Sequence, residues 1–348
     1  MKNFTVVIPE YNELSKDPRG FEEQLSYVSD LSKAYDVKLV DDSSTDGSWE
    51  RIKEFVRTEG PEFQALRISP NGRKVGAIKK GAEESSEKYV VLTDYDSRIV
   101  NPEMIYETIS NFDKNPRIAG IGLKISVDAN SLWSKIQKFE YQVSEIVNSM
   151  YLNKQRKLRC ISGAGGIWKR EVLLELLKYH SGRHNGDDME TTAMAMRNGY
   201  EVIYDPRIEV KTKLPKSMKG IFDQRTRWAL GALETFEKER DFYFDQIKNL
   251  KSRLGHVILM EWMGWATLPL AAFSLGLSLK DSNLQHLQNY LWYYLSDLGI
   301  SSLIFGAGRK EIDQKKYFAL LPLFPFFRTI TRFPTYSTAL YKFIREKI

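Results

Sequence analysis

The chain has 348 residues, of which 42% are apolar and 28% are charged. This length corresponds to about two domains of ~150 residues, and the composition supports a core and excludes general disorder. A single cysteine excludes an internal disulfide and a multi-cysteine zinc site. The net charge of +6 is small beside 45 acidic residues, so we expect no nucleic-acid partner. The mean hydropathy of −0.40 excludes a transporter with many spans, although it allows a few membrane segments.

The first ~100 residues alternate apolar strand patterns with amphipathic helical patterns. This order predicts an α/β fold with a mostly parallel sheet and helices on both faces. Ligands bind beyond the carboxyl ends of the strands in such sheets. The predicted strands cover 4–8, 37–40, 63–68 and 89–93, and the predicted helices cover 20–35, the segment carrying Trp49, Ile52 and Phe55, and 74–85.

Acidic pairs follow two of these strands. Asp94 and Asp96 form a DxD pattern, which can hold one Mg²⁺ or Mn²⁺ together with a diphosphate, although it is also compatible with a polar turn. Asp41 and Asp42 follow the second strand, where a carboxylate could bind a base or ribose or where the segment could cap a helix. Both pairs are expected at the same edge of the sheet.

Two later motifs also carry polar chemistry. Asp188, in a Gly-Asp-Asp turn that opens a helix, can act as a general base toward a hydroxyl, or it can serve as a helix cap. An amphipathic helix is predicted over 216–240, and it carries Gln224, Arg227 and Trp228. Arginine there can bind phosphate and tryptophan can stack on a sugar, although an interface helix would have the same pattern.

The composition becomes apolar after residue 250. Residues 257–279 contain only Glu261 as a charge and are long enough to cross a ~30 Å hydrocarbon core, while 287–308 are a weaker candidate. We predict a membrane hairpin over 257–308, with a buried hairpin of a soluble bundle as the alternative, and an interfacial segment over 317–327. The basic residues expected to face the cytosol or lipid headgroups are Lys248, Lys251, Arg253, Arg309, Lys310, Lys315, Lys316, Arg328, Arg332, Lys342, Arg345 and Lys347.

The motifs, taken in chain order, resemble the inverting family-2 glycosyltransferases, and the last motif resembles the processive membrane branch with hyaluronan, chitin and cellulose synthases. The resemblance covers roughly residues 4–230 and implies a GT-A (Rossmann-like) catalytic domain. It rests on Pro9-Glu10-Tyr11-Asn12-Glu13, Val40-Asp41-Asp42-Ser43-Ser44-Thr45-Asp46-Gly47, Asp94-x-Asp96, Gly186-Asp187-Asp188 and Gln224-x-x-Arg227-Trp228.

The resemblance also implies a role for each matching residue. Asp188 matches the catalytic base, and Asp94 and Asp96 match the metal site for Mg²⁺ or Mn²⁺. The residues that match the donor nucleotide site are Pro9, Tyr11, Glu13, Asp41, Asp42, Lys74 and Asp94. Those that match the acceptor and diphosphate site are Ser162, Gly163, Asp187, Gln224, Arg227 and Trp228.

The implied activity is metal-dependent transfer of a sugar from a nucleotide sugar to a hydroxyl of an oligosaccharide or polysaccharide. The resemblance implies a UDP-linked donor, because members of this family often use UDP-sugars. A polyprenyl-phosphate sugar transferase, a nucleotidyltransferase and a non-enzymatic membrane-binding module are the alternatives. We predict a catalytic domain over 1–212, interface helices over 213–250 and a membrane-associated region over 251–348. The N-terminus has no secretory-signal pattern, so a cytoplasmic catalytic domain at the cell membrane is expected, in contact with lipids and as a possible homo-oligomer.

Overall fold

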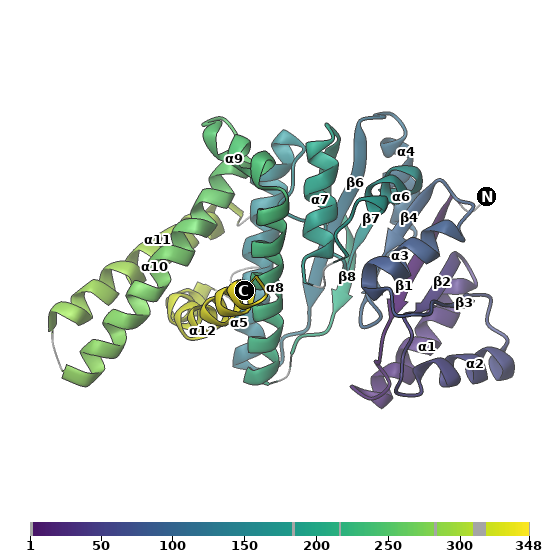
Figure 1. The fold of residues 1–348 in the computed structure, drawn as a ribbon, viewed down its shortest axis with the longest axis horizontal. Helices are drawn as coiled ribbons and strands as arrows, with labels where there is room; N and C mark the ends of the chain where they lie inside the picture. Colours follow the sequence, from purple (N-terminus) through teal and green to yellow (C-terminus); the bar gives the residue numbers. More distant parts are fainter. Residues whose placement is uncertain (1–2, 183–184, 216, 282–283, 309–317, 348) are drawn as a thin grey trace. The chain divides into compact units, whose positions relative to one another are not determined.

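The computed structural model describes residues 3–182, 185–215, 217–281, 284–308 and 318–347. The chain divides into two compact units (Figure 1). The first unit comprises residues 1–126 and 156–213, and the second comprises 127–155 and 214–348. Residues 127–155, which lie within the predicted catalytic segment 1–212, belong to the second unit.

The first unit is built on an eight-stranded sheet of order β3-β2-β1-β4-β7-β6-β8-β5. Strands β1 to β4 are parallel, as predicted, whereas β7 runs antiparallel to both β4 and β6. The sheet as a whole is therefore mixed. The strands are β1 (Phe4–Glu10), β2 (Asp36–Asp41), β3 (Gln64–Arg67), β4 (Tyr89–Leu92), β5 (Arg98–Ile99), β6 (Ile118–Val127), β7 (Gly166–Lys169) and β8 (Glu201–Thr212).

The mixed half arises because the chain leaves the sheet after β6. Parallel neighbours require a crossover that packs on the sheet, usually a helix. The helix after β6 belongs to the second unit, so the chain returns to β7 without such a crossover and pairs antiparallel. Local residue patterns carry no information about this return.

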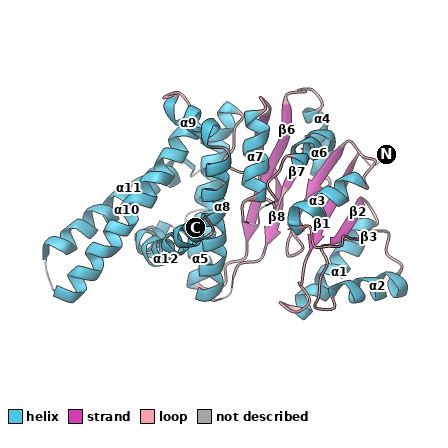
Figure 2. Cartoon of the chain, in the orientation of Figure 1, coloured by secondary structure: helices cyan, strands magenta, loops and turns pink. Residues whose placement is uncertain are grey.

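Helices cover both faces of the sheet, as predicted (Figure 2). Side chains alternate along a strand, so Val6 and Ile8 of β1 join a core with α1, α2 and α4, while Val7 points to the opposite face. There α3 approaches closely at Gly81, where a Cβ atom would lie 2.4 Å from Val7 Cγ1. The helices are α1 (Pro18–Ser32), α2 (Ser48–Glu59), α3 (Arg73–Glu83), α4 (Met104–Phe112), α6 (Arg170–Lys178) and α7 (Asp187–Arg197).

The second unit is built of helices and the segments that connect them, as far as its residues are described, apart from Val127 at the end of β6. Its main core contains Phe139 of α5, which stacks on Phe305 of α11 at 4.2 Å between ring centres and meets Phe324 of α12 at 4.4 Å. Helix α12 also packs along α8. The helices are α5 (Leu132–Ile146) with a π-helical extension (Val147–Leu152) and a 3-10 turn (Asn153–Gln155), α8 (Met218–Lys238), α9 (Arg240–Lys248), α10 (Arg253–Asp281), α11 (Leu284–Gly308), a 3-10 segment (Phe318–Leu323) and α12 (Phe324–Arg345).

Helices α10 and α11 lie side by side as a hairpin over the predicted segment (Figure 1). Among the described residues, the segment Arg253–Lys280 is the one helix long and apolar enough to cross a membrane, with a mean hydropathy of 1.3. Side chains on this hairpin are widely exposed; Leu270 is 68% exposed and Leu303 is 76% exposed. The flanking charges at 309, 310, 315 and 316 lie outside the described residues.

Two basic residues of the C-terminal helix differ from our expectation. Arg328 and Arg332 were predicted to face lipid headgroups, but Arg328 pairs with Asp297 of α11 and Arg332 pairs with Glu140 of α5. Both carboxylates are nearly buried, and a buried carboxylate requires a charged partner. These two arginines therefore balance charge inside the helical unit.

Candidate active site

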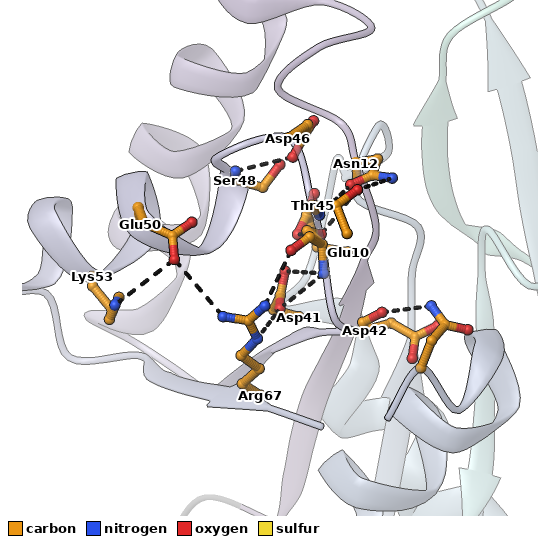
Figure 3. A network of polar contacts seen from close by, with 12 residues as sticks. Glu10, Asn12, Asp41, Asp42, Thr45, Asp46, Ser48, Glu50, Lys53 and Arg67 are labelled. Atoms are coloured by element: carbon orange, nitrogen blue, oxygen red, sulfur yellow. Dashed lines mark hydrogen bonds and ion pairs between the residues drawn. The ribbon is translucent and has the colours of Figure 1, made fainter. Parts of the chain in front are cut away.

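The parallel register brings three charged side chains together at the carboxyl ends of β1, β2 and β3 (Figure 3). Glu10 pairs with Asp41, and Asp41 pairs with Arg67, across the adjacent strands. The Arg67 Nε atom lies 3.1 Å from Asp41 Oδ2, and the Ser44 backbone N–H donates to the same carboxylate. Asp41 is fully buried, so this ion pair belongs to the framework of the loop that follows β2.

Glu10 completes this network. Its carboxylate accepts hydrogen bonds from the Ser44 hydroxyl at 3.0 Å and from the Glu13 backbone N–H at 2.9 Å. Burial and the neighbouring Asp41 carboxylate raise the pKa of Glu10 to about 7, although its hydrogen bonds act in the opposite direction. Glu10 therefore keeps its proton to a higher pH than an ordinary glutamate does.

Asp42 lies at the same edge but has different partners. Its Oδ1 atom accepts from the Gly72 backbone N–H at 2.7 Å, and its carbonyl accepts from the Asn71 amide at 2.6 Å. Burial raises the pKa of Asp42 above its ordinary value. These bonds join the loop after β2 to the start of α3.

Tyr11, in the loop after β1, is 44% exposed and available to a ligand.

Pro9 and Glu13 frame this part of the site without contacting the central carboxylates by their side chains. Pro9 lies within β1 opposite Val40. The Glu13 side chain pairs with Lys16 at 2.8 Å. Direct nucleotide contacts by Pro9, Tyr11, Glu13, Asp41 and Asp42 stay predictions.

A second cluster gathers around Lys74, at the first turn of α3. Its Nζ atom lies 2.5 Å from Asp94 Oδ1, and about a third of each side chain remains exposed. Burial lowers the pKa of Lys74, but the charges of Asp94, Asp187 and Asp188 outweigh this effect and raise it well above its ordinary value. Three predicted site carboxylates from two distant segments thus surround one ammonium group.

Asp96, the second acid of the DxD pattern, is held from β8. Its Oδ1 atom accepts hydrogen bonds from Ser97 Oγ at 3.0 Å and from Thr212 Oγ1 at 3.4 Å. Burial and the charge of Asp94 raise the pKa of Asp96 to about 6. Both hydrogen bonds end on the same oxygen.

The residues present fit a divalent cation held together with a diphosphate. Among the described residues of this cluster, the four carboxylates of Asp94, Asp96, Asp187 and Asp188 outnumber the Lys74 ammonium. Burial together with the neighbouring carboxylates raises the pKa of Asp187 to about 6. Carboxylate oxygens are ligands that Mg²⁺ and Mn²⁺ prefer. Among the described residues, no group of three or more His, Cys, Asp or Glu is arranged to hold a metal ion. Phosphate oxygens would have to complete the coordination.

Asp188 is oriented by backbone donors. Its Oδ2 atom accepts from the Gly163 N–H at 3.1 Å, and its Oδ1 atom accepts from the Met189 N–H at 2.8 Å. Gly163 follows Ser162 in a turn before β7, and a Cβ atom at Gly163 would lie 2.4 Å from Lys74 Nζ. A Cβ atom at this position would therefore displace the Lys74 ammonium, which is the far end of a flexible side chain, while Asp188 would stay at an ordinary contact distance.

The Gln-x-x-Arg-Trp motif lies on α8, in the second unit. Arg227 and Trp228 are exposed and Gln224 is half-buried. Tyr141 of α5 meets the Trp228 ring edge-on, with 6.3 Å between ring centres. These three side chains share one helix face because they are spaced at i, i+3 and i+4.

Several residues that build the cluster had no signal in the sequence. Thr212 bonds Asp96 from 116 positions further along the chain, and Thr192 Oγ1 accepts from the Ile161 N–H while donating to the Asp188 carbonyl. Arg67 did have a signal in the sequence. It is a positively charged residue at the end of β3, and the parallel strand β2 ends in the acidic residue Asp41. Threonines in a strand and a helix carry no comparable signal.

The mixed sheet, with carboxylates at the ends of β1, β2 and β4, defines an α/β nucleotide-binding domain of GT-A type. The family model described as "Glycosyltransferase like family 2" matches residues 2–231, more than half of the chain. The chain therefore belongs to glycosyltransferase family 2.

Curated relatives include poly-β-1,6-N-acetyl-D-glucosamine synthases. The Staphylococcus epidermidis protein is 26% identical over 229 residues, which cover 65% of this chain and 53% of the relative. The Staphylococcus aureus (strain COL) protein is 26% identical over 249 residues, which cover 70% of this chain and 57% of the relative. The chain thus spans little more than half the length of these relatives.

A solved structure with a similar fold is a mannosyltransferase from Pyrobaculum calidifontis in complex with GDP-Man and Mn²⁺. It is 17% identical in sequence, the TM-score is 0.61, and the match covers 99% of this chain and 88% of the other. At this identity the likeness concerns the fold, including the helical C-terminal part.

Proposed function

We propose that the protein transfers a sugar from a nucleotide sugar to an acceptor hydroxyl with inversion at the anomeric carbon. The observation that carries the proposal is the convergence of Asp94, Asp187 and Asp188 on Lys74 beside the end of β4. Family membership supports the reaction class. It does not support a nucleotidyltransferase or a non-enzymatic membrane-binding module.

The leaving group is a nucleoside diphosphate, whose charge increases as the glycosidic bond breaks. A divalent cation held by Asp94 and Asp96 would neutralise part of that charge when bound. Lys74 lies against Asp94 and supplies a second positive charge at the same place. Fixed charges of this kind contribute a large share of catalysis because they need no reorganisation during the reaction.

Asp188 is the proposed general base. The acceptor oxygen attacks the anomeric carbon, its proton passes to the Asp188 carboxylate, and the bond to the diphosphate breaks on the opposite side. The two backbone donors from Gly163 and Met189 fix the direction of this carboxylate. General-base assistance is typically worth ~10²–10⁴-fold in rate.

The donor and acceptor classes follow from the relatives. Synthases of poly-β-1,6-N-acetyl-D-glucosamine match two-thirds of the chain, so we propose a polysaccharide or oligosaccharide acceptor and a UDP-linked N-acetylhexosamine as the first donor to test. GDP-mannose is the second, because a mannosyltransferase shares the fold. The apolar helix α10 and the exposed side chains of the α10–α11 hairpin support placement at a membrane. A cytoplasmic catalytic unit is the orientation we propose, on the basis of the basic residues that flank the hairpin in the sequence.

The test measures released nucleoside diphosphate from membranes that contain the full chain. Each nucleotide sugar is supplied with an oligosaccharide acceptor and with Mn²⁺, Mg²⁺ or a chelator. We expect metal-dependent release with one donor and loss of transfer, but not of donor binding, in Asp188→Asn. The matched control is Asp30→Asn, which removes an exposed carboxylate of α1 that pairs with the neighbouring Lys33. Near-normal transfer by Asp188→Asn would overturn the assignment of the base.

A further inference from the structure

Arg225 lies within the Gln224–Trp228 segment but is not one of the residues that define the motif. Successive helical residues are turned by roughly 100°, so Arg225 lies beside the face that carries Gln224, Arg227 and Trp228. Its side chain is only 8% exposed, whereas Trp228 is 45% exposed. A buried guanidinium in this position requires an explanation, because an unpaired buried charge is strongly unfavourable.

The Arg225 side chain touches two residues of the motif. Its Nη1 atom donates to Gln224 Oε1 at 2.8 Å. Its guanidinium carbon lies 4.1 Å from the centre of the Trp228 ring, within the range of a cation–π interaction. One planar group therefore restricts the rotamers of both the Gln224 amide and the Trp228 indole.

Arg225 is itself held by Glu140 of α5. Its Nη2 atom donates to Glu140 Oε2 at 2.7 Å, and the other carboxylate oxygen accepts from Arg332 Nη2 of α12 at 3.1 Å. Burial raises the pKa of Glu140, but the charges of Arg225 and Arg332 outweigh this effect and lower it to about 2. Glu140 is thus a permanent anion that links three helices of the second unit.

We propose that Glu140 and Arg225 are positioning residues for the Gln224-Arg227-Trp228 motif. Glu140 fixes the guanidinium of Arg225, and Arg225 fixes the side chains of Gln224 and Trp228 for contact with the diphosphate and the acceptor sugar. The role of the motif rests on the proposed function, whereas the positioning itself does not. A buried ion pair gives little net stability compared with apolar residues of the same size. The stability of the fold therefore does not by itself explain the presence of the Glu140–Arg225 pair.

The test has one readout that is independent of catalysis. The protein is labelled with 5-fluorotryptophan, and the ¹⁹F resonance of Trp228 is assigned as the signal that disappears in Trp228→Phe. We expect this resonance to shift and broaden in Glu140→Gln and in Arg225→Met. The transfer rate, kcat/KM, is expected to fall at least tenfold in both. The double variant is expected to match Arg225→Met within twofold, because Glu140 acts through Arg225.

The matched control is Asp297→Asn, which removes another nearly buried carboxylate of the same unit, one that pairs with Arg328. We expect an unchanged Trp228 resonance and a rate within threefold of the wild type. An unchanged Trp228 resonance in Glu140→Gln, or an equal change in Asp297→Asn, would overturn the proposal. If Glu140→Gln fails to fold, the double variant decides, since it removes both charges together. Absence of transfer by the wild type would contradict the proposed function, and the ¹⁹F result would still decide the positioning.

Discussion

The pH dependence of the Glu10 site offers a sharp test of the network at the strand ends. The pKa of Glu10 is raised from 4.5 to about 7 in the folded protein, mainly by burial. The folded state therefore binds this proton more tightly than the unfolded state does. The stabilisation is fully present below pH 4.5 and is lost as pH rises through about 7.

The magnitude follows from the size of the shift. Each pKa unit corresponds to about 1.4 kcal/mol, so the free energy of unfolding is expected to fall by about 3 kcal/mol between pH 4.5 and 8 through this group. Glu10→Gln keeps the shape of the protonated acid and removes the charge. Its amide oxygen can accept from the Glu13 N–H, and its amide nitrogen can donate toward Asp41. We therefore expect this variant to be more stable than the wild type at pH 8 by up to about 3 kcal/mol.

The assay is hydrogen exchange of peptides from β1 and β2 in the full chain, measured against urea from pH 4.5 to 8. Peptide-level exchange reports opening of the first unit without assuming that both units unfold together. Glu59→Gln, which removes an exposed carboxylate at the end of α2, serves as the control. Equal pH profiles for the wild type and Glu10→Gln, or a less stable Glu10→Gln at pH 8, would refute the reasoning.

Three further predictions concern the cluster and its framework. In Gly163→Ala, the new Cβ displaces the Lys74 ammonium from a position only 2.4 Å away; we expect kcat to fall about tenfold with an unchanged melting temperature, as checked by steady-state kinetics and thermal unfolding. Thr212→Val removes a hydroxyl that bonds Asp96; the Mn²⁺ concentration for half-maximal transfer is expected to rise about threefold or more, and an unchanged metal titration would contradict this. Asp41→Asn weakens the buried pairing with its arginine partner on β3, and a loss of about 2 kcal/mol in urea unfolding is expected; a loss below about 0.5 kcal/mol would show that the pair contributes little.

The residue patterns predicted the first half of the sheet well because local periodicity governs it. The expected strand 37–40 is β2, and the expected helix 74–85 is α3, each within two residues of the observed bounds. The carboxyl ends of parallel strands lie at the same edge of a sheet. The sequence therefore predicted that Asp42 and Asp94, which each follow a strand, lie at that edge. Spacing at i, i+3 and i+4 likewise fixed the common face of Gln224, Arg227 and Trp228.

Features that depend on contacts between distant segments could not be predicted. The register that sets Glu10 beside Asp41, the hydroxyl of Thr212 on Asp96, and the antiparallel return of β7 all follow from pairing across long stretches of chain. Membership of α5 in the helical unit is another such feature.

The sequence by itself determined the family, the types of chemical group at the site and the helices and strands that present them, because motif spacing and hydrophobic periodicity are local properties. Only the tertiary structure decided which charged side chains form ion pairs within the protein. Arg328 and Arg332 look like lipid-facing residues in a basic tail, and Asp41 looks like a ligand-binding acid. Packing pairs each of the three with an opposite charge, and in each pair the carboxylate is buried or nearly buried, since a charge removed from water must meet an opposite charge nearby.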